Sequence, residues 1–224
     1  RDFQDKTREQ VRADIQSYQD SAKVPLLLGV DEEGGTVCVL PPTQIFAMSP
    51  TGLPAGSMKR AAWTLFSLWR GTKSAPCKLG LNVNFAPVCD ITQQEGAFLY
   101  DRSLGQDART TAGYVGKVVS YGEEGMGCVL KHFPGYGNNP DTHTGIAVDE
   151  RPYEPSSGRT SSPLRRASKP GRGAWLVSHN IVTCRDGEAP ASLSPEVATG
   201  CLREELGFTG CIDHRRPGDG RHPG

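Results

Sequence analysis

The chain alternates short apolar runs with longer stretches whose apolar residues recur at helical spacing. The apolar runs are bounded by glycine, proline or polar residues, as strands buried on both faces are. Four of them predict strands, at 26–30, 83–88, 128–130 and 174–179. Helices are predicted at 7–20, 107–124 and 195–206. This alternation predicts an α/β fold with a parallel sheet, and specifically a (β/α) barrel.

The predicted helices carry capping residues and apolar faces. Thr7 is expected to cap the first helix, with Gln10 at the capping-box position. The core face of this helix is predicted to hold Val11, Ile15 and Tyr18. Asp107 is the expected cap of the second helix, whose core face is Ala108, Ala112, Val115, Val118 and Val119. The third helix is expected to begin at Ser194-Pro195-Glu196 and to end at Gly207.

Length and composition exclude several classes of protein. The 224 residues suit one domain, and the net charge of zero gives no reason to expect nucleic acid or a membrane surface as a partner. No apolar run approaches 18 residues, so no membrane segment is expected. No signal peptide is visible, which favours a cytoplasmic protein, although the first residues resemble the middle of a domain and leave a lost signal open. Seven cysteines without a C-x-x-C pair predict reduced thiols rather than a metal site.

The candidate chemistry is concentrated in the stretch KHFPGYGNNPDTHTG, residues 131–145. Lys131 and His132 follow the apolar run 128–130, and a glycine-rich loop then leads to Asp141 and His143. Barrel proteins keep their chemistry at such strand ends and loops. Asp141 can fix the tautomer of the His143 ring for acid/base work, although an isolated Asp-x-His pair is more often a loop hydrogen bond.

Polar residues also follow the other predicted strands. Asp31 is interpreted as a ligand-facing carboxylate rather than as part of a solvated acidic loop with Glu32 and Glu33. Asp90 is interpreted as a structural or supporting carboxylate. Arg102 is open to two interpretations, a surface ion pair or a ligand-binding guanidinium. His179, at the end of the strand 174–179, is interpreted as a satisfied core histidine rather than a substrate contact.

These motifs resemble family 3 glycoside hydrolases, in the β-N-acetylhexosaminidase branch. Besides residues 131–145, the matching pieces stand in family order: LLLGVDEEGG at 26–35, LGLNVNFAPVCDI at 79–91, DRSLG at 101–105, and SHNIV, ASLSPEV and LREELGFTG between 178 and 210. The resemblance implies an incomplete (β/α)8 TIM-like barrel, with its first strand before residue 1 and its last one or two beyond 224. Matches this long and in this order are far more specific than a single short motif.

The resemblance also implies a function and site residues. The Asp141–His143 pair would protonate the leaving oxygen, while Asp31, Arg102, Lys131 and His132 would hold the sugar. The expected reaction is retaining hydrolysis of β-linked N-acetylglucosamine, as in cell-wall muropeptide fragments, without a metal or other cofactor. A β-N-acetylglucosaminide phosphorylase and a non-catalytic sugar-binding remnant stay open as alternatives.

The carboxylate nucleophile that a retaining glycosidase needs is missing. The family keeps it in a T/S-D-D-L-x-M motif after GFTG, whereas residues 211–220 read CIDHRRPGDG. Asp213 is out of register for this role. Permitted codons for 211–222, read one base later, give VLITDDLAMDGI, so that the nucleophile codon straddles Arg215 and Arg216.

Other stretches regain family-typical sequence in the other shifted frame, as NPNFR for 43–47, LYEAGGMD for 57–64 and DFLPFAAGIEAGAG for 160–173. We therefore interpret residues 1–224 as one partial barrel domain that is out of frame over about 39–77, 155–173 and 211–224. One loss is an arginine expected where Val39 stands. The shifted windows are rich in Pro, Gly, Ser and Arg, so the chain as it stands is expected to be unstable or partly disordered, and inactive.

Overall fold

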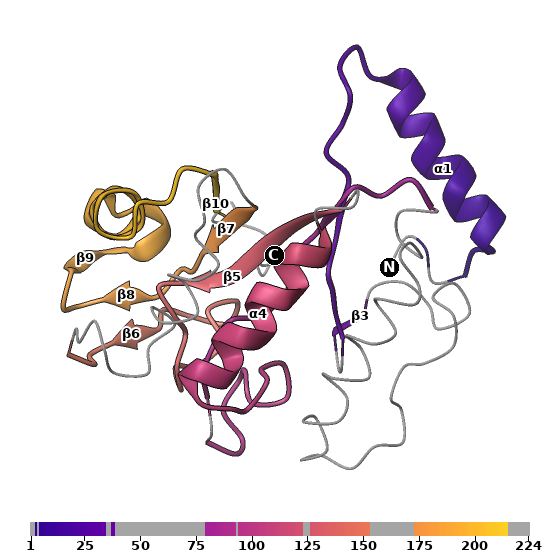
Figure 1. The fold of residues 1–224 in the computed structure, drawn as a ribbon. Helices are drawn as coiled ribbons and strands as arrows, with labels where there is room; N and C mark the ends of the chain where they lie inside the picture. The colour runs from indigo at the N-terminus through magenta and orange to yellow at the C-terminus, as the bar shows by residue number, and fades with distance from the viewer. Residues whose placement is uncertain are drawn as a thin grey trace, which may run out of the picture.

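The computed structural model describes residues 3, 5–34, 37, 38, 79–92, 94–122, 126–152 and 173–214. Its centre is a five-stranded sheet of order β1-β4-β5-β7-β10, in which every neighbouring pair is parallel (Figure 1). The strands are β1 Gly29–Val30, β4 Val83–Asn84, β5 Gly127–Phe133, β7 Ala174–Val177 and β10 Cys211–His214. Their order in the sheet is their order in the chain, as in a barrel. The predicted α/β fold with a parallel sheet is confirmed.

The strands differ from their predictions mainly in length. β5 is longer than the predicted 128–130 and brings Lys131 and His132 into the strand itself. The predicted strand 83–88 is shortened to β4, and Val88 makes only an isolated parallel bridge to Lys131. Pro87 has no N–H to donate, which interrupts a continuous ladder there.

The strand predicted at 26–30 is reduced to β1, and Leu27 is 83% exposed. The side chain of Asn82 explains the difference. Its Oδ1 accepts from Leu28 N at 2.7 Å, and its Nδ2 donates to the Leu26 carbonyl at 2.9 Å. A side chain therefore satisfies the backbone that a strand ladder would otherwise have paired.

Helix α1, Arg8–Ser21, begins with the predicted capping box between Thr7 and Gln10. Val11 and Ile15 are buried against a small cluster with Val30, Leu79 and Leu81. The prediction for Tyr18 was wrong, because its side chain is 51% exposed. The buried apolar cluster under α1 extends only as far as Ile15, so the last turn of the helix has no described core to cover.

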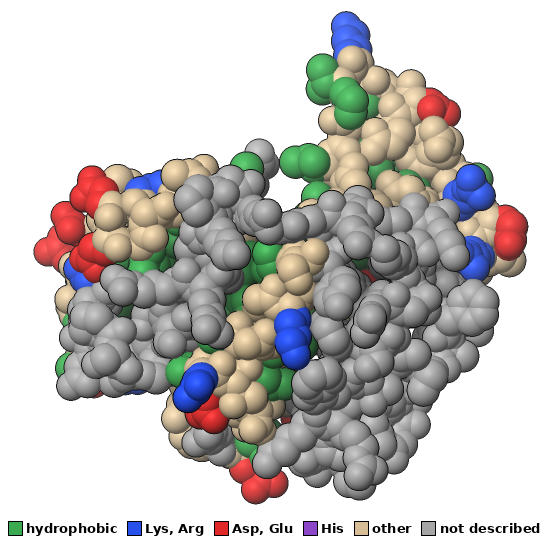
Figure 2. Space-filling view, viewed as in Figure 1, with side chains coloured by type: hydrophobic (Ala, Val, Ile, Leu, Met, Phe, Trp, Pro, Cys, Tyr) green, Lys and Arg blue, Asp and Glu red, His purple; other side chains and the backbone are tan. Residues whose placement is uncertain are grey.

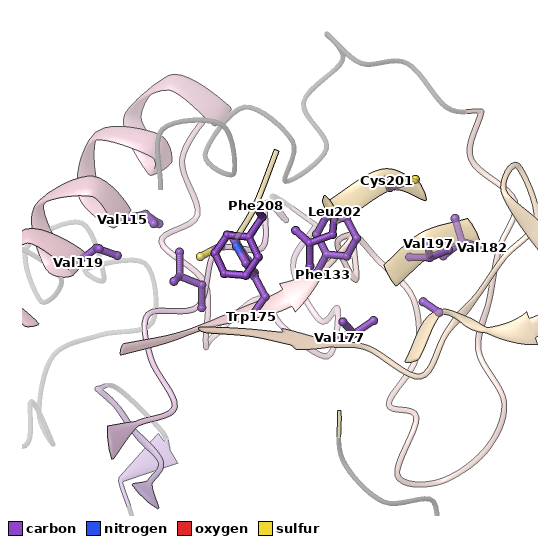
Figure 3. Close-up of a cluster of buried hydrophobic side chains, with 13 residues drawn as sticks. Val115, Val119, Phe133, Trp175, Val177, Val182, Val197, Cys201, Leu202 and Phe208 are labelled. Carbon is purple, nitrogen blue, oxygen red and sulfur yellow. The ribbon is translucent and has the colours of Figure 1, made fainter. Parts of the chain in front are cut away.

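Helix α4, Ala108–Gly122, packs against β5 and supplies the main core (Figures 1 and 3). Asp107 caps it as predicted, with Oδ1 accepting from Thr110 N at 2.9 Å. Ala112, Val115, Val118 and Val119 are buried as predicted, whereas Ala108 is half-buried. Figure 3 shows Val115 and Val119 of α4 on one side of Phe133 and Trp175, with the third helix on the other. Helices thus cover the outer face of the sheet.

The third helix is a π-helix, η2, Glu196–Glu205, preceded by the 3-10 helix η1, Ala191–Leu193. Ser194 Oγ accepts from Val197 N at 3.4 Å, so the predicted cap is present. Gly207, at φ +67°, follows the last turn, in the left-handed conformation that ends many helices. This helix packs into the main core through Val197, Cys201 and Leu202.

The described residues also form two small sheets. β2, Glu32–Gly34, pairs antiparallel with β3, Val37–Cys38. β6, Val148–Asp149, β8, Ile181–Val182, and β9, Asp186–Pro190, form the other sheet. Acidic and basic side chains are interspersed over the coloured part of the face in Figure 2. Among the described helices, none is long and apolar enough to cross a membrane.

The three windows predicted to be out of frame fall almost wholly outside the described residues. Only Gly173 and the strand β10 of these windows are described. Val39 and the Arg215–Arg216 pair also lie outside. The frame interpretation therefore stays a prediction.

Candidate active site

The carboxyl ends of the parallel strands bring Asp31 and Lys131 together. Asp31 directly follows β1, and Lys131 lies near the end of β5, two strands away in the sheet. Lys131 Nζ donates to Asp31 Oδ1 at 2.6 Å, and the lysine side chain is only 1% exposed. These two residues are 100 positions apart in the chain. Two of the residues that the resemblance assigns to the sugar are therefore in direct contact.

Glu33, in β2, joins Arg102 to this pair. Arg102 donates to Glu33 through Nε at 2.9 Å and through Nη2 at 2.7 Å, a bidentate contact. Lys131 Nζ lies 2.5 Å from Glu33 Oε1. The Glu33 side chain is 0% exposed, whereas that of Arg102 is 15% exposed. Asp31, Glu33, Arg102 and Lys131 thus form one charge cluster.

The electrostatics of the charge cluster follow from this pairing. Burial raises the pKa of Glu33, but hydrogen bonds and charge from Arg102 and Lys131 outweigh it, so that the pKa falls below its ordinary value of 4.5. Burial lowers the pKa of Arg102, and the Glu33 contact reverses this and raises it. The formal charges of the charge cluster, two carboxylates and two cations, sum to zero.

Sequence reasoning missed Glu33, which it placed with Asp31 and Glu32 in a possible solvated loop. A signal was available. Residues two apart in an extended chain share a face, so a ligand-facing Asp31 at a strand end predicts the same side for Glu33.

His132 is held by the buried Asp90 rather than by the charge cluster. Asp90 Oδ2 accepts from His132 N at 3.0 Å and lies 2.7 Å from the ring Nδ1. Its other oxygen accepts from Tyr136 N at 2.6 Å. The predicted supporting role of Asp90 is confirmed by these contacts. Because the carboxylate faces Nδ1, we assign the ring proton there, which leaves Nε2 as a hydrogen-bond acceptor.

The Asp141–His143 pair lies on the loop after β5 and is more exposed. His143 Nδ1 lies 2.5 Å from Asp141 Oδ1, and the two side chains are 46% and 29% exposed. Burial raises the pKa of Asp141, yet hydrogen bonds from the His143 backbone and ring bring it below 3.8. The sequence predicted a dyad or a loop hydrogen bond, and the contact itself is present.

Phe98 connects this loop to the charge cluster. Its ring is 6.4 Å from the His143 ring, edge to face, and the guanidinium carbon of Arg102 lies 5.1 Å from the Phe98 centroid. On the loop itself, the hydroxyl of Tyr136 accepts from Thr142 N at 2.9 Å and also contacts the Thr142 hydroxyl. The dyad is therefore adjacent to the sugar-binding candidates.

Two other candidates have hydrogen-bond partners outside these groups. His179 Nδ1 is 2.6 Å from Ser192 Oγ, so that one ring nitrogen of this histidine is satisfied within the protein. Asp213, in β10, accepts from His214 N at 2.8 Å. No group of three histidine, cysteine or acidic side chains among the described residues could hold a metal ion.

Comparisons with known proteins identify the family of this chain. The sequence profile of the Glycosyl hydrolase family 3 N terminal domain matches residues 2–214. The beta-hexosaminidase of Nitrosomonas eutropha is 32% identical, over 84% of this chain and 55% of its own length. That of Stenotrophomonas maltophilia K279a is 30% identical, over 92% and 62%. The chain therefore spans little more than half of these relatives.

Solved structures agree on the fold. A family 3 β-N-acetylglucosaminidase from Paenibacillus sp. FPU-7 superposes with a TM-score of 0.81 at 28% identity, covering 93% of this chain and 40% of that one. A family 3 glycosyl hydrolase from Mycobacterium smegmatis gives 0.76 at 28% identity, covering 93% and 64%. The sheet and its strand ends are those of this barrel domain.

Proposed function

Because this chain belongs to glycosyl hydrolase family 3, we propose that the intact protein is a retaining β-N-acetylhexosaminidase. Its substrates are β-linked N-acetylglucosaminides, such as muropeptide fragments of the cell wall. The observation that carries the proposal is the charge cluster at the strand ends beside the Asp141–His143 loop. A cluster of this kind offers paired donors and acceptors to hydroxyl groups, and the loop offers a proton.

The sugar is held by four side chains with complementary capacities. Asp31 accepts hydrogen bonds from ring hydroxyls, while Lys131 and Arg102 donate to hydroxyl or acyl oxygens. His132 Nε2 accepts, because Asp90 occupies the other ring nitrogen. Fixing a sugar in this way places its anomeric carbon relative to the catalytic groups.

The Asp141–His143 pair supplies the proton. Asp141 holds the ring through Nδ1, so that Nε2 is the nitrogen available to the glycosidic oxygen. In the first step His143 gives a proton to the leaving oxygen as the bond to the anomeric carbon breaks and a carboxylate attacks that carbon. In the second step His143 takes a proton from water, and water displaces the carboxylate.

The chain as it stands lacks that carboxylate, because Arg215 and Arg216 occupy its expected place. A guanidinium cannot attack the anomeric carbon, and its positive charge opposes an oxocarbenium-like transition state. We therefore propose that this chain binds the sugar without turning it over. The alternative for the intact enzyme is that phosphate, rather than water, accepts the sugar, which would make it a phosphorylase.

The test compares this chain with the frame-corrected protein. The latter is expressed from the resequenced gene, from its own start codon to its own stop codon. Both are assayed on an aryl N-acetylglucosaminide, with and without phosphate, and calorimetry measures N-acetylglucosamine binding. We expect turnover only from the frame-corrected protein, and free N-acetylglucosamine as its product. A sugar phosphate formed only with phosphate present would identify a phosphorylase. Equal turnover by both proteins would overturn the frame interpretation.

A further inference from the structure

Glu33 is the most deeply buried acidic group of the charge cluster. Its side chain is 0% exposed and makes three short contacts, two to Arg102 and one to Lys131. A buried carboxylate is costly unless cations pair with it. In the proposed function, both of its partners, Arg102 and Lys131, bind the sugar. A substitution at Glu33 should therefore alter sugar binding through these two side chains.

The contacts of Glu33 fix the direction of the donors that remain for a ligand. Arg102 has five N–H donors, and Glu33 takes those of Nε and one on Nη2. Lys131 has three, of which Asp31 and Glu33 accept two. With its plane held by two parallel hydrogen bonds, the guanidinium cannot rotate, and its free donors keep one orientation.

Exposure is graded across the charge cluster. Lys131 and Glu33 are 1% and 0% exposed, whereas Arg102 and Asp31 are 15% and 27% exposed. The cluster is therefore accessible at Arg102 and Asp31 and closed at Glu33. A ligand can contact Arg102 directly, whereas Lys131 is buried with Glu33 beneath the exposed part of the cluster.

We propose that Glu33 is a positioning and specificity residue, which orients Arg102 and Lys131 and cancels their charge so that the site accepts a neutral sugar and rejects anions. This inference rests on the proposed function. With Glu33 present, two carboxylates balance two cations. Without its charge, the charge cluster keeps one carboxylate, Asp31, against two cations, and the added positive charge in a poorly solvated site attracts an anion.

Three substitutions in the full chain separate charge from position. Glu33→Gln removes the charge, and Glu33→Asp keeps the charge but shortens the side chain. Glu32→Gln is the matched control, because it removes one charge from the neighbouring position of β2, and alternation along a strand directs neighbouring side chains to opposite faces. Calorimetry measures binding of N-acetylglucosamine and, separately, of inorganic phosphate, and circular dichroism checks that each variant is folded.

We expect Glu33→Gln to weaken sugar binding roughly tenfold or more, the loss typical of a hydrogen bond to a charged group. The same variant should gain phosphate binding that competes with the sugar. Glu33→Asp should also weaken sugar binding but should still reject phosphate. Glu32→Gln should match the unsubstituted chain in both titrations. A residue that only stabilised the fold would not produce a gain of anion binding.

Sugar affinity within twofold of the unsubstituted chain in Glu33→Asp, or continued rejection of phosphate by a folded Glu33→Gln, would overturn the inference. If Glu33→Gln does not fold, the Glu33→Asp titrations decide it. Failure of the proposed function is a different result, namely an unsubstituted chain that binds no N-acetylglucosamine. In that case the phosphate titrations still test whether Glu33 cancels the charge of the cations.

Discussion

Replacing Asp141 by Asn in the frame-corrected enzyme tests the acid/base role of the loop. The carboxylate of Asp141 contacts both the ring Nδ1 of His143, at 2.5 Å, and its backbone N, at 2.9 Å. Asparagine has nearly the same shape but no charge. The substitution therefore weakens the hydrogen bond to the His143 ring without leaving a cavity where the Asp141 side chain lay.

The size of the effect follows from the exposure of the pair. A hydrogen bond to a charged group contributes roughly 1.5–3 kcal/mol. Here the side chains are 46% and 29% exposed, so water screens the contact and the lower end applies. About 1.4 kcal/mol of lost transition-state stabilisation is a roughly tenfold fall in rate.

The assay compares two substrates that differ in their need for a proton. An alkyl N-acetylglucosaminide has a poor leaving group and should lose roughly tenfold in kcat/KM, whereas an activated aryl N-acetylglucosaminide should change little. Asp5→Asn, in an exposed turn before α1, is the control and should leave both substrates unaffected. Equal losses on both substrates would refute the assignment of this pair to proton transfer.

Three further predictions concern the chain as it stands. Leu130→Ala should lower the free energy of unfolding by about 2–5 kcal/mol in urea titration, since Leu130 is 0% exposed; a loss under about 1 kcal/mol would contradict the core assignment. Thr7→Ala should cost about 0.5–2 kcal/mol by the same measurement, and Ser17→Ala, an exposed control in α1, less. Because the folded pKa of Glu33 lies below 4.5, its stabilisation is present above pH 4.5 and is lost as the pH falls through the lowered value. Glu33→Gln should flatten the fall in melting temperature below pH 4.5; an unchanged slope would contradict the pairing.

Local signals in the sequence predicted local structure well. The capping box of Thr7 and Gln10, the Asp107 cap and the apolar run of β5 depend on residues within one or two turns of each other. Such features need no knowledge of the rest of the fold. The same holds for the contact between Asp141 and His143, which are two positions apart.

What the sequence could not give were contacts set by distant segments. Tyr18 has the spacing of a core residue but lies beyond the apolar cluster that α1 covers. Leu27 looks like part of a buried strand, yet Asn82, more than 50 positions away, takes its neighbours' backbone groups. Glu33 has the sequence context of a solvated acid, but in the structure it accepts hydrogen bonds from Arg102, 69 positions later in the chain. Each outcome depends on tertiary placement that periodicity does not encode.

The register of the sheet bears on whether Asp213 could replace the missing nucleophile. Asp213 in β10 and Lys131 in β5 are both paired with Leu176 of β7. Residues in register across parallel strands share a face, so Asp213 is level with a residue that holds the sugar in the proposed site. The nucleophile is expected two positions later, about 6.6 Å further along an extended chain. A displacement of about 1 Å can already cost roughly a hundredfold in rate. Asp213 therefore lies on the same face as the expected nucleophile but too far from the anomeric carbon to replace it.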